Sequence, residues 1–359
     1  MGIRITNCFI VATALCLTAT LASANGVIHY VNVNNTNPVI PYTSWLTAAT
    51  NIQDAVVHSS FGDTVLVTNG MYQSGGDSWN GSNRVDDISG VPILSVNGPA
   101  VTTIVGYQVP GTTNGTAAVR CVYLHEFGTL SGFTLTGGSV PISSYAGGVM
   151  AETLCVVSNC VIVGNAGYYA GGVYSGNGSL LVNCVIASNT ATYSSGSGGG
   201  VYGCILSNSV VKNNYAATGA GQANGTAYNC LFTGNGSTNS SGGTSGGAAY
   251  FSTLVNCTVA GNFSHTLGAL DGCKATNSII YYNFNGNYAD CYQCTLAYSC
   301  TTLGTGTASL PPNCTSNAPG FVDLGGVATC EFKSSRRSPI SPATKISAEP
   351  PAVALRRFW

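Results

Sequence analysis

Short apolar runs recur along the middle of the chain, between residues 155 and 283, and predict strands. Each run spans three to five residues, is rich in β-branched side chains and is bounded by Gly, Asn or Ser, without helical periodicity. The runs belong to a seven-residue phrase that begins and ends with Asn and has Cys or Ser at its second position. The phrase begins at Asn159, Asn183, Asn208, Asn229, Asn256 and Asn277. A period of 21 to 27 residues is typical of a solenoid in which each unit forms one coil of a parallel β-helix.

Two repeated features of these units predict structural roles. Stacked coils would bring the six Asn side chains that open the phrase above one another, so that each amide bonds the next in a ladder. We therefore interpret these Asn residues as structural. Glycine pairs precede most copies, and we expect them to form tight turns with a positive φ that lead into a strand. The pairs are Gly147-Gly148, Gly171-Gly172, Gly199-Gly200 and Gly246-Gly247.

The repeats resemble a known family, the right-handed parallel β-helix proteins of the pectin-lyase-like group. Within that group they look like the polymorphic outer-membrane-protein repeat, which is marked by a GGA[IV] turn and an FxxN phrase. Phe232-Thr233-Gly234-Asn235 matches the FxxN phrase, and Gly246-Gly247-Ala248 is close to the turn. The resemblance covers roughly residues 130 to 305. It implies an all-β fold, a single-stranded right-handed parallel β-helix.

The N-terminal part of the chain predicts a capping helix. Residues 28–33 and 62–67 predict strands, and the apolar residues between them fall at helical spacing from Trp45 to Val56. We therefore expect one amphipathic helix after Ser44, covering the open end of the first coil. This part also resembles the opening of many β-helix proteins, through Ile52-Gln53-Asp54-Ala55 and Gly62-Asp63-Thr64-Val65.

The chain divides into four parts. Residues 1–24 are typical of a secretory signal peptide, with Arg4, an apolar stretch and the small-residue site Ala22-Ser23-Ala24. Residues 25–137 would hold the cap and the early coils, and residues 138–324 the repeat coils of the same β-helix. Residues 325–359 carry six of the eleven basic residues and four prolines, which predicts a flexible basic tail. We expect a secreted or cell-surface protein with no membrane span after signal cleavage.

Composition excludes some classes of protein and leaves the role of cysteine open. Only 6% of residues are charged and 45% are hydrophobic, which argues against an electrostatic nucleic-acid binder and against disorder. Thirteen cysteines follow residue 24, and an exported protein permits disulfides. We interpret those at one shared repeat position as small buried apolar residues instead. They are Cys160, Cys184, Cys230 and Cys257. The CxxC pair Cys291 and Cys294 lacks the partners of a zinc site, so no metal site is predicted.

The resemblance also implies an enzymatic alternative. Polysaccharide lyases of the group bind Ca²⁺ through clustered carboxylates and use a basic residue as base, and its hydrolases use Asp pairs. Ca²⁺ would be a cofactor only in this alternative; otherwise no cofactor is expected. No catalytic motif of the group is present, but Asp86, Asp87 and Arg120 could converge from early coils. His125 and Glu126 would point to opposite faces of a strand, so we expect no dyad between them.

Tyrosines are frequent in or beside the variable loops. An exposed Tyr on a solenoid could stack on sugar rings or meet a protein partner, while packing against neighbouring coils is the alternative. The candidates for ligand binding are Tyr168, Tyr169, Tyr193 and Tyr215.

These features favour an exported, non-catalytic recognition protein, adhesin-like or glycan-binding, that presents its variable loops along one side. Its partner would be a polysaccharide or a cell-surface protein, and not a nucleic acid. Two alternatives remain: a polysaccharide lyase or glycoside hydrolase, and a structural surface or matrix component. Three or more acidic side chains converging on one groove would favour the enzyme, whereas a smooth groove of Asn, Ser and Thr would favour binding.

Overall fold

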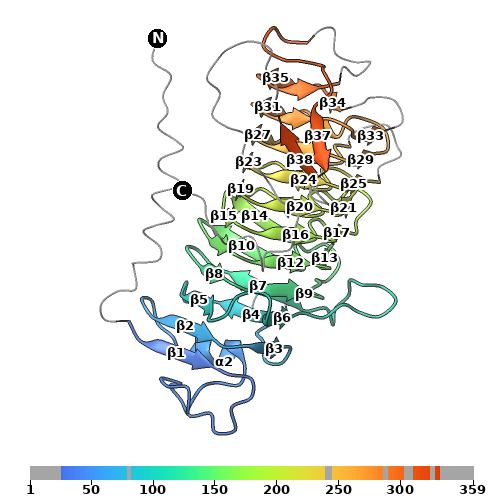
Figure 1. Cartoon of the computed structure of the whole chain (residues 1–359). Helices are drawn as coiled ribbons and strands as arrows, with labels where there is room; N and C mark the ends of the chain where they lie inside the picture. The colour runs from blue at the N-terminus through green and yellow to red at the C-terminus, as the bar shows by residue number, and fades with distance from the viewer. Residues whose placement is uncertain are drawn as a thin grey trace.

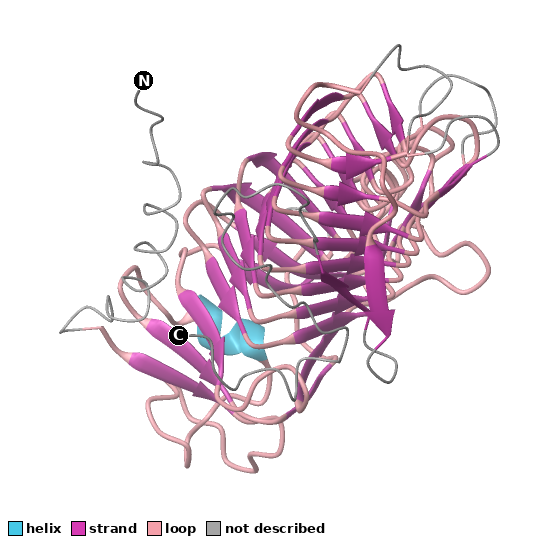
Figure 2. Ribbon diagram, turned by 45° about the horizontal axis from the view of Figure 1, so that its top comes forward, coloured by secondary structure: helices cyan, strands magenta, loops and turns pink. Residues whose placement is uncertain are grey.

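The chain forms one elongated stack of strands, running in Figure 1 from blue at the first strands to orange at the last coils. The computed structural model describes residues 26–78, 82–238, 245–285, 290–302, 310–323 and 328–331. Within these residues four parallel sheets form, and Figure 2 shows strands of successive coils side by side along the stack. The expected all-β, right-handed parallel β-helix is confirmed. The proposed signal peptide lies outside the described residues.

Two long sheets run along the whole stack. The eleven-stranded sheet contains β1 (Ile28–Val31), β2 (Thr64–Val67), β5 (Pro92–Ser95), β8 (Thr129–Ser131), β11 (Val156–Ser158), β15 (Leu180–Val182), β19 (Ile205–Ser207), β23 (Thr226–Tyr228), β27 (Thr253–Val255), β31 (Lys274–Thr276) and β35 (Thr295–Ala297). The ten-stranded sheet contains β3 (Gly70–Tyr72), β6 (Thr102–Val105), β9 (Thr134–Thr136), β12 (Val161–Val163), β16 (Val185–Ala187), β20 (Val210–Lys212), β24 (Leu231–Thr233), β28 (Thr258–Ala260), β32 (Ile279–Ile280) and β36 (Cys300–Thr301).

Two shorter sheets complete the coil. The nine-stranded sheet contains β4 (Asn83–Asp87), β7 (Arg120–Leu124), β10 (Val149–Thr153), β14 (Val173–Asn177), β18 (Val201–Tyr202), β22 (Gln222–Ala223), β26 (Ala249–Tyr250), β30 (Leu270–Asp271) and β34 (Cys291–Tyr292). The six-stranded sheet begins only in the later coils and contains β13 (Ala166–Gly167), β17 (Thr190–Ala191), β21 (Tyr215–Ala216), β25 (Gly236–Ser237), β29 (Phe263–Ser264) and β33 (Phe284–Asn285). β37 (Gly320–Asp323) and β38 (Ala328–Glu331) follow as an antiparallel pair, so residues 328–331 of the expected tail form a paired strand; its residues 325–327 and 332–359 lie outside the described part.

The apolar core forms by strand alternation. Inward side chains of successive coils stack in register, as Ile162 does on Ile186 and Val211, all fully buried. Burying each such side chain stabilises the fold by roughly 1.5–3 kcal/mol. The repeated apolar runs of the sequence thus form the strands that surround this core and supply its buried side chains.

Two asparagine ladders run along the stack, one exposed and one buried. The residues that open the repeated phrase have a left-handed backbone, from Asn208 at φ 50° to Asn256 at φ 56°, and four exposed amide bonds join them from coil to coil. The residues that close the phrase form a second ladder, in which each amide donates to the carboxamide oxygen of the next coil. They are Asn165, Asn189, Asn214, Asn235, Asn262 and Asn283. Our ladder prediction covered the opening residues, while the closing ones carry the more buried ladder.

Three of the four glycine pairs are required by close packing and not by a positive φ, which corrects our expectation for them, whereas Gly246 has the expected positive φ, 58°. Neither Gly147 nor Gly171 has a positive φ. A Cβ at Gly147 would lie 2.2 Å from the carbonyl oxygen of Ala166, and one at Gly171 would lie 2.4 Å from that of Gly199. Only glycine therefore lets the backbones of these coils approach so closely.

The N-terminal helix is shorter than the sequence predicts. Helix α2 (Ile52–Val57) begins at its N-cap Asn51, because the Asn51 side chain accepts a bond from the Asp54 amide. Ala49 instead pairs with the backbone of Tyr30, which holds the preceding residues outside the helix. The helix packs against β4, the end strand of the nine-stranded sheet. None of the described residues belongs to a helix long and apolar enough to cross a membrane.

The four cysteines at the shared repeat position are buried free thiols at coil corners: Cys160, Cys184, Cys230 and Cys257. Cys160 and Cys184 lie in register with Ser209, and each thiol donates to the backbone carbonyl two residues before it. The Ser209 hydroxyl makes the same bond. This corner therefore takes a small side chain that can donate to the backbone, and Cys and Ser both meet that requirement.

Candidate active site

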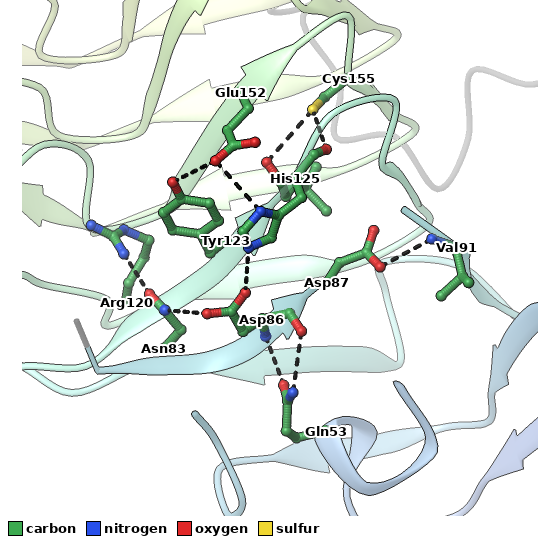
Figure 3. A network of polar contacts seen from close by, with 11 residues as sticks. Gln53, Asn83, Asp86, Asp87, Val91, Arg120, Tyr123, His125, Glu152 and Cys155 are labelled. Atoms are coloured by element: carbon green, nitrogen blue, oxygen red, sulfur yellow. Dashed lines mark hydrogen bonds and ion pairs between the residues drawn. The ribbon is translucent and has the colours of Figure 1, made fainter. Parts of the chain in front are cut away.

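A cluster of charged and polar side chains lies on the first three strands of the nine-stranded sheet, β4, β7 and β10 (Figure 3). Asp86 of β4 lies opposite Tyr123 of β7, and Leu124 lies opposite Ala151 of β10. His125, which follows β7, is thereby brought next to Glu152 on one side and Asp86 on the other. The pairing of three coils assembles the cluster from residues distant in sequence.

His125 lies between two carboxylates. Its Nε2 is 2.9 Å from Oδ1 of Asp86, and its Nδ1 is 3.5 Å from Oε1 of Glu152. The Asp86 side chain is fully buried, whereas those of His125 and Glu152 are 24% and 30% exposed. An imidazole that donates from both nitrogens carries a positive charge, which two carboxylates would stabilise. His125 and Glu152 are therefore the members that solvent or a ligand can reach.

Asp86 is held in place by the cap and by its own strand. The side-chain amide of Gln53 accepts from the Asp86 backbone N–H (2.7 Å) and donates to its carbonyl (3.1 Å), as a neighbouring strand would. The Asn83 amide donates to Oδ2 of Asp86 at 2.9 Å. Burial raises the pKa of Asp86, and the bonds from His125 and Asn83 oppose that rise.

Arg120 is a supporting residue. Its guanidinium donates to the backbone carbonyls of Ala146 (2.9 Å) and Tyr145 (3.1 Å) and to the side chain of Asn83. It is only 5% exposed, and burial lowers its pKa to about 10. With its donors engaged inside the protein, Arg120 orients Asn83, and through it Asp86, and does not face a ligand.

Tyr123 links the cluster to Glu152. Its hydroxyl donates to Oε1 of Glu152 at 2.8 Å, and its ring lies 5.5 Å from the Arg120 guanidinium. Burial and the neighbouring Glu152 raise the pKa of Tyr123 to about 12. The hydroxyl therefore stays protonated and holds the Glu152 carboxylate in position.

Asp87 does not join this network. Its Oδ1 accepts from the Val91 amide at 3.0 Å, while its buried Oδ2 has no hydrogen-bond partner. Burial raises the pKa of Asp87 to about 7, so the carboxyl is largely protonated in mildly acidic solution. Of the three residues predicted to converge, Asp86 and Arg120 meet through Asn83, and Asp87 stands apart.

The Ca²⁺ considered for an enzyme does not fit these carboxylates. The Asp86 oxygens already accept bonds from His125 and Asn83, and Asp87 follows it in the strand, where side chains alternate between faces. A calcium site needs several free oxygens around one point. Among the described residues, no group of three or more His, Cys, Asp or Glu side chains could hold a metal ion.

The sequence prediction missed His125, Glu152, Tyr123 and Asn83. It considered His125 only beside Glu126 and expected no dyad there, whereas the partners of His125 are Asp86, 39 residues away, and Glu152. Glu152 lies one coil beyond His125, within the repeat length of the later coils, so extending the repeat upstream could have found it. The distance to Asp86 matches no repeat, and no sequence pattern indicates it.

Three of the four tyrosines predicted to bind a ligand lie together. Tyr168 and Tyr193 stack with ring centroids 4.6 Å apart, and Tyr169 meets both rings edge to face. Tyr215 lies on β21 of the six-stranded sheet and is 48% exposed. The rings of Tyr168, Tyr169 and Tyr193 thus pack against one another and are still partly exposed.

Comparisons with known proteins bear on the fold. No protein-family model matches the sequence, and no curated protein matches it. Among solved structures, the chain is similar to pectate lyase Pel9A, with 12% identity over 85% of each chain and a TM-score of 0.50. It is also similar to the A-module of the Azotobacter vinelandii mannuronan C-5 epimerase AlgE4, with 13% identity over 66% of this chain and 68% of that one and a TM-score of 0.39. The likeness to the pectate lyase shows a shared fold.

Proposed function

We propose that the protein is a β-helix enzyme that cleaves a polysaccharide, with His125 and Glu152 as its proton-transfer residues. One arrangement carries this proposal: the partly exposed imidazole of His125 lies between buried Asp86 and exposed Glu152. Acid–base catalysis needs a positioned donor and acceptor that a substrate can reach, and this pair supplies both. The similarity to a pectate lyase supports a polysaccharide as the substrate.

The roles follow from the hydrogen bonds. As general acid, the imidazolium form of His125 gives a proton to the glycosidic oxygen as the carbon–oxygen bond breaks. Glu152, held by the Tyr123 hydroxyl, takes a proton either from the attacking water in a hydrolysis or from a ring carbon in an elimination. Asp86 is a positioning residue that fixes the imidazole from inside the protein.

The first test measures polysaccharide cleavage by the chain without residues 1–24 and by two histidine variants of it. Polymer length and the absorbance of a new carbon–carbon double bond are followed on neutral and acidic polysaccharides, with and without Ca²⁺. His125→Gln should lower the rate by about 10²- to 10⁴-fold, the usual contribution of a general acid or base. His265→Gln, at an exposed histidine of the later coils, is the matched control and should cleave like the unaltered protein.

Either of two results would contradict the proposal. Equal loss of activity in His125→Gln and His265→Gln would show that the effect is not specific to the cluster. Intact polymers throughout the panel, with a protein of unchanged far-ultraviolet spectrum, would show that the chain does not cleave polysaccharides.

A second candidate is the non-catalytic recognition protein, adhesin-like and exported. The burial of Asp86 and the internal bonds of Arg120 favour it, because a network whose members satisfy one another can serve stability alone. The resemblance to the polymorphic outer-membrane-protein repeat supports it as well. Retention on a polysaccharide without any shortening of the polymer would favour this candidate over the enzyme.

A further inference from the structure

Six tyrosine rings form a continuous patch on the outside of the stack. We call them the tyrosine face: Tyr145, Tyr168, Tyr169, Tyr174, Tyr193 and Tyr202. Their centroids follow one another at 4.2 to 5.1 Å, from Tyr202 through Tyr174, Tyr145, Tyr169 and Tyr168 to Tyr193. All six rings are partly exposed, and Tyr145 is the most open at 39%. The patch combines a large apolar area with six hydroxyl groups.

The tyrosine face begins one strand away from the candidate active site. In the nine-stranded sheet Tyr174 lies opposite Met150, and Met150 lies opposite Tyr123, whose hydroxyl holds Glu152. Tyr202 extends the same outward column to the next coil. A chain bound near His125 and Glu152 and running along the stack would therefore cross the tyrosine face.

Among the described residues, no exposed positive side chain belongs to this patch: Arg120 donates to the Tyr145 carbonyl but is only 5% exposed. Between residues 138 and 300 the lysines are Lys212 and Lys274, and there is no arginine. Lys212 lies on β20 of the ten-stranded sheet, and Lys274 on β31 of the eleven-stranded sheet. Proteins recognise carboxylate groups largely through Arg and Lys, so a polyuronate would find no counter-charge along the tyrosine face.

The tyrosine side chains suit an uncharged ligand with hydroxyl groups. Burial, with the neighbouring Tyr145 and Tyr202, raises the pKa of Tyr174, which keeps its hydroxyl neutral and able to donate and accept. The rings of Tyr174 and Tyr202 are nearly parallel, at 9°, so their edges and hydroxyls repeat with the strand spacing of about 4.8 Å. Packed tyrosines also offer contact area at a low cost in conformational entropy.

On the basis of the proposed function, we infer that the tyrosine face binds a neutral polysaccharide chain lying along the stack, with its reactive bond at His125 and Glu152. A neutral sugar has no carboxylate that would make a ring proton acidic, so the reaction on this substrate is the hydrolysis, in which Glu152 takes the proton of the attacking water. The protein's substrate class then differs from the acidic polymer named for the structurally similar pectate lyase. The sugar rings would contact the tyrosine edges, and the tyrosine hydroxyls would bond the sugar hydroxyls.

The test is affinity electrophoresis of the protein in gels that contain glucomannan, mixed-linkage β-glucan, polygalacturonate or alginate. The two neutral polymers should retard the protein and the two acidic ones should not. The double variant Tyr174→Ala/Tyr202→Ala should bind the neutral polymers about tenfold more weakly or worse, as expected for central aromatic contacts. Tyr228→Ala, at a partly exposed tyrosine on β23 of the eleven-stranded sheet, is the matched control and should bind normally.

The outcomes separate this inference from the proposed function. Tyrosine-dependent retardation without cleavage supports the binding face and counts against the enzyme. Cleavage with a KM that the double variant leaves unchanged supports the enzyme and overturns the binding face. Three further results also overturn the binding face: retardation by the acidic polymers alone, retardation by none of the four polymers, or an equal loss of binding in Tyr228→Ala. If the double variant misfolds, Tyr174→Phe is tested instead, because it removes one hydroxyl and keeps the ring. It should weaken binding by a smaller factor than expected for the double variant. Unchanged binding would contradict the proposed hydrogen bonds between tyrosine and sugar hydroxyls.

Discussion

In the early coils, polar side chains of different kinds form contacts that occur only once. In the later coils, the same polar side chain recurs in every coil and forms a column. Asp86 and His125 are 39 residues apart and form a single contact. In the later coils, neighbours in the buried ladder such as Asn189 and Asn214 are 21 to 27 residues apart and repeat one contact five times. The two regions share one core and three of the four parallel sheets, and they differ most in their polar groups.

The difference shows how one solenoid can provide both stability and reactivity. In the buried ladder each amide both donates to and accepts from its neighbours, and the ladder ends on the Oδ1 of Asp290. Around His125 the members differ in charge and proton affinity, and buried Asp87 leaves one oxygen without a partner. Within the ladder, repetition gives each amide a partner of its own kind, whereas irregular coil lengths bring together groups of different chemistry.

Breaking the buried ladder should give the largest loss of stability. Asn214 donates to the Ile186 carbonyl and to Asn235, and its oxygen accepts from the backbone and side chain of Asn189. Asn214→Ala leaves a buried backbone N–H and a buried carbonyl unpaired, which should lower the free energy of unfolding by roughly 3–5 kcal/mol. Urea unfolding followed by circular dichroism measures the change.

The exposed ladder supplies the control for this change. Asn229 bonds Asn208 and Asn256, each at 3.2 Å, at exposed positions, and its φ is 53°. Asn229→Gly keeps the left-handed backbone accessible and removes both side-chain bonds, so it should cost no more than about 1 kcal/mol. An equal loss in the two variants would show that burial does not account for the strength of the closing ladder.

The same contrast explains what the sequence could predict. In a phrase repeated six times, equivalent positions of successive copies are expected to stack, so the repeat sets the register between coils. The strands, the core and the stacking of Asn and Cys could therefore be predicted from the spacing of the repeats. The site around His125 has no repeat to set its register, because the early coils differ in length and Asp86 comes from the strand beside the cap. Three of the four glycine pairs were assigned the wrong cause, since close approach between coils is visible only once the coils are stacked; Gly246 alone among them has the predicted positive φ.

In the early coils, Asp87 should make stability depend on pH. The unfolded chain releases this proton near pH 3.9, and the folded one near pH 7. Between these values the folded state binds more protons, so the contribution of Asp87 to stability falls as pH rises from about 4 to about 7 and stays low above. Asp87→Asn should therefore raise the free energy of unfolding at pH 8 by roughly 2–4 kcal/mol, with little change at pH 4.

Paired urea titrations of the unaltered protein and Asp87→Asn across this pH range isolate that group. Asp86 and His125 are present in both proteins, so their titration largely cancels in the difference. A difference that does not vary with pH would mean that Asp87 is ionised normally in the folded protein, and one that grows toward low pH would reverse the sign argued here.

The smallest effect is expected from exchanging one member of a corner column for another. The Cys184 thiol donates to the Val182 carbonyl at 3.3 Å, and burial raises its pKa, so it remains a neutral donor. Cys184→Ser keeps a donor at this place, as Ser209 does one coil later, and should change the free energy of unfolding by less than about 1 kcal/mol. Cys184→Ala loses the donor and leaves a small void, so it should lower the free energy of unfolding by roughly 1–3 kcal/mol.

Two results would contradict this prediction. If Cys184→Ser lowers the free energy of unfolding as much as Cys184→Ala does, the corner depends on the sulfur itself. If thiol titration of the unfolded protein finds Cys184 oxidised, a disulfide with its column neighbour Cys160 would replace the hydrogen-bonded thiol. If neither result is found, Cys and Ser are interchangeable in this column. The later coils then owe their stability to the repeated register and backbone hydrogen bonds, and not to the chemistry of cysteine.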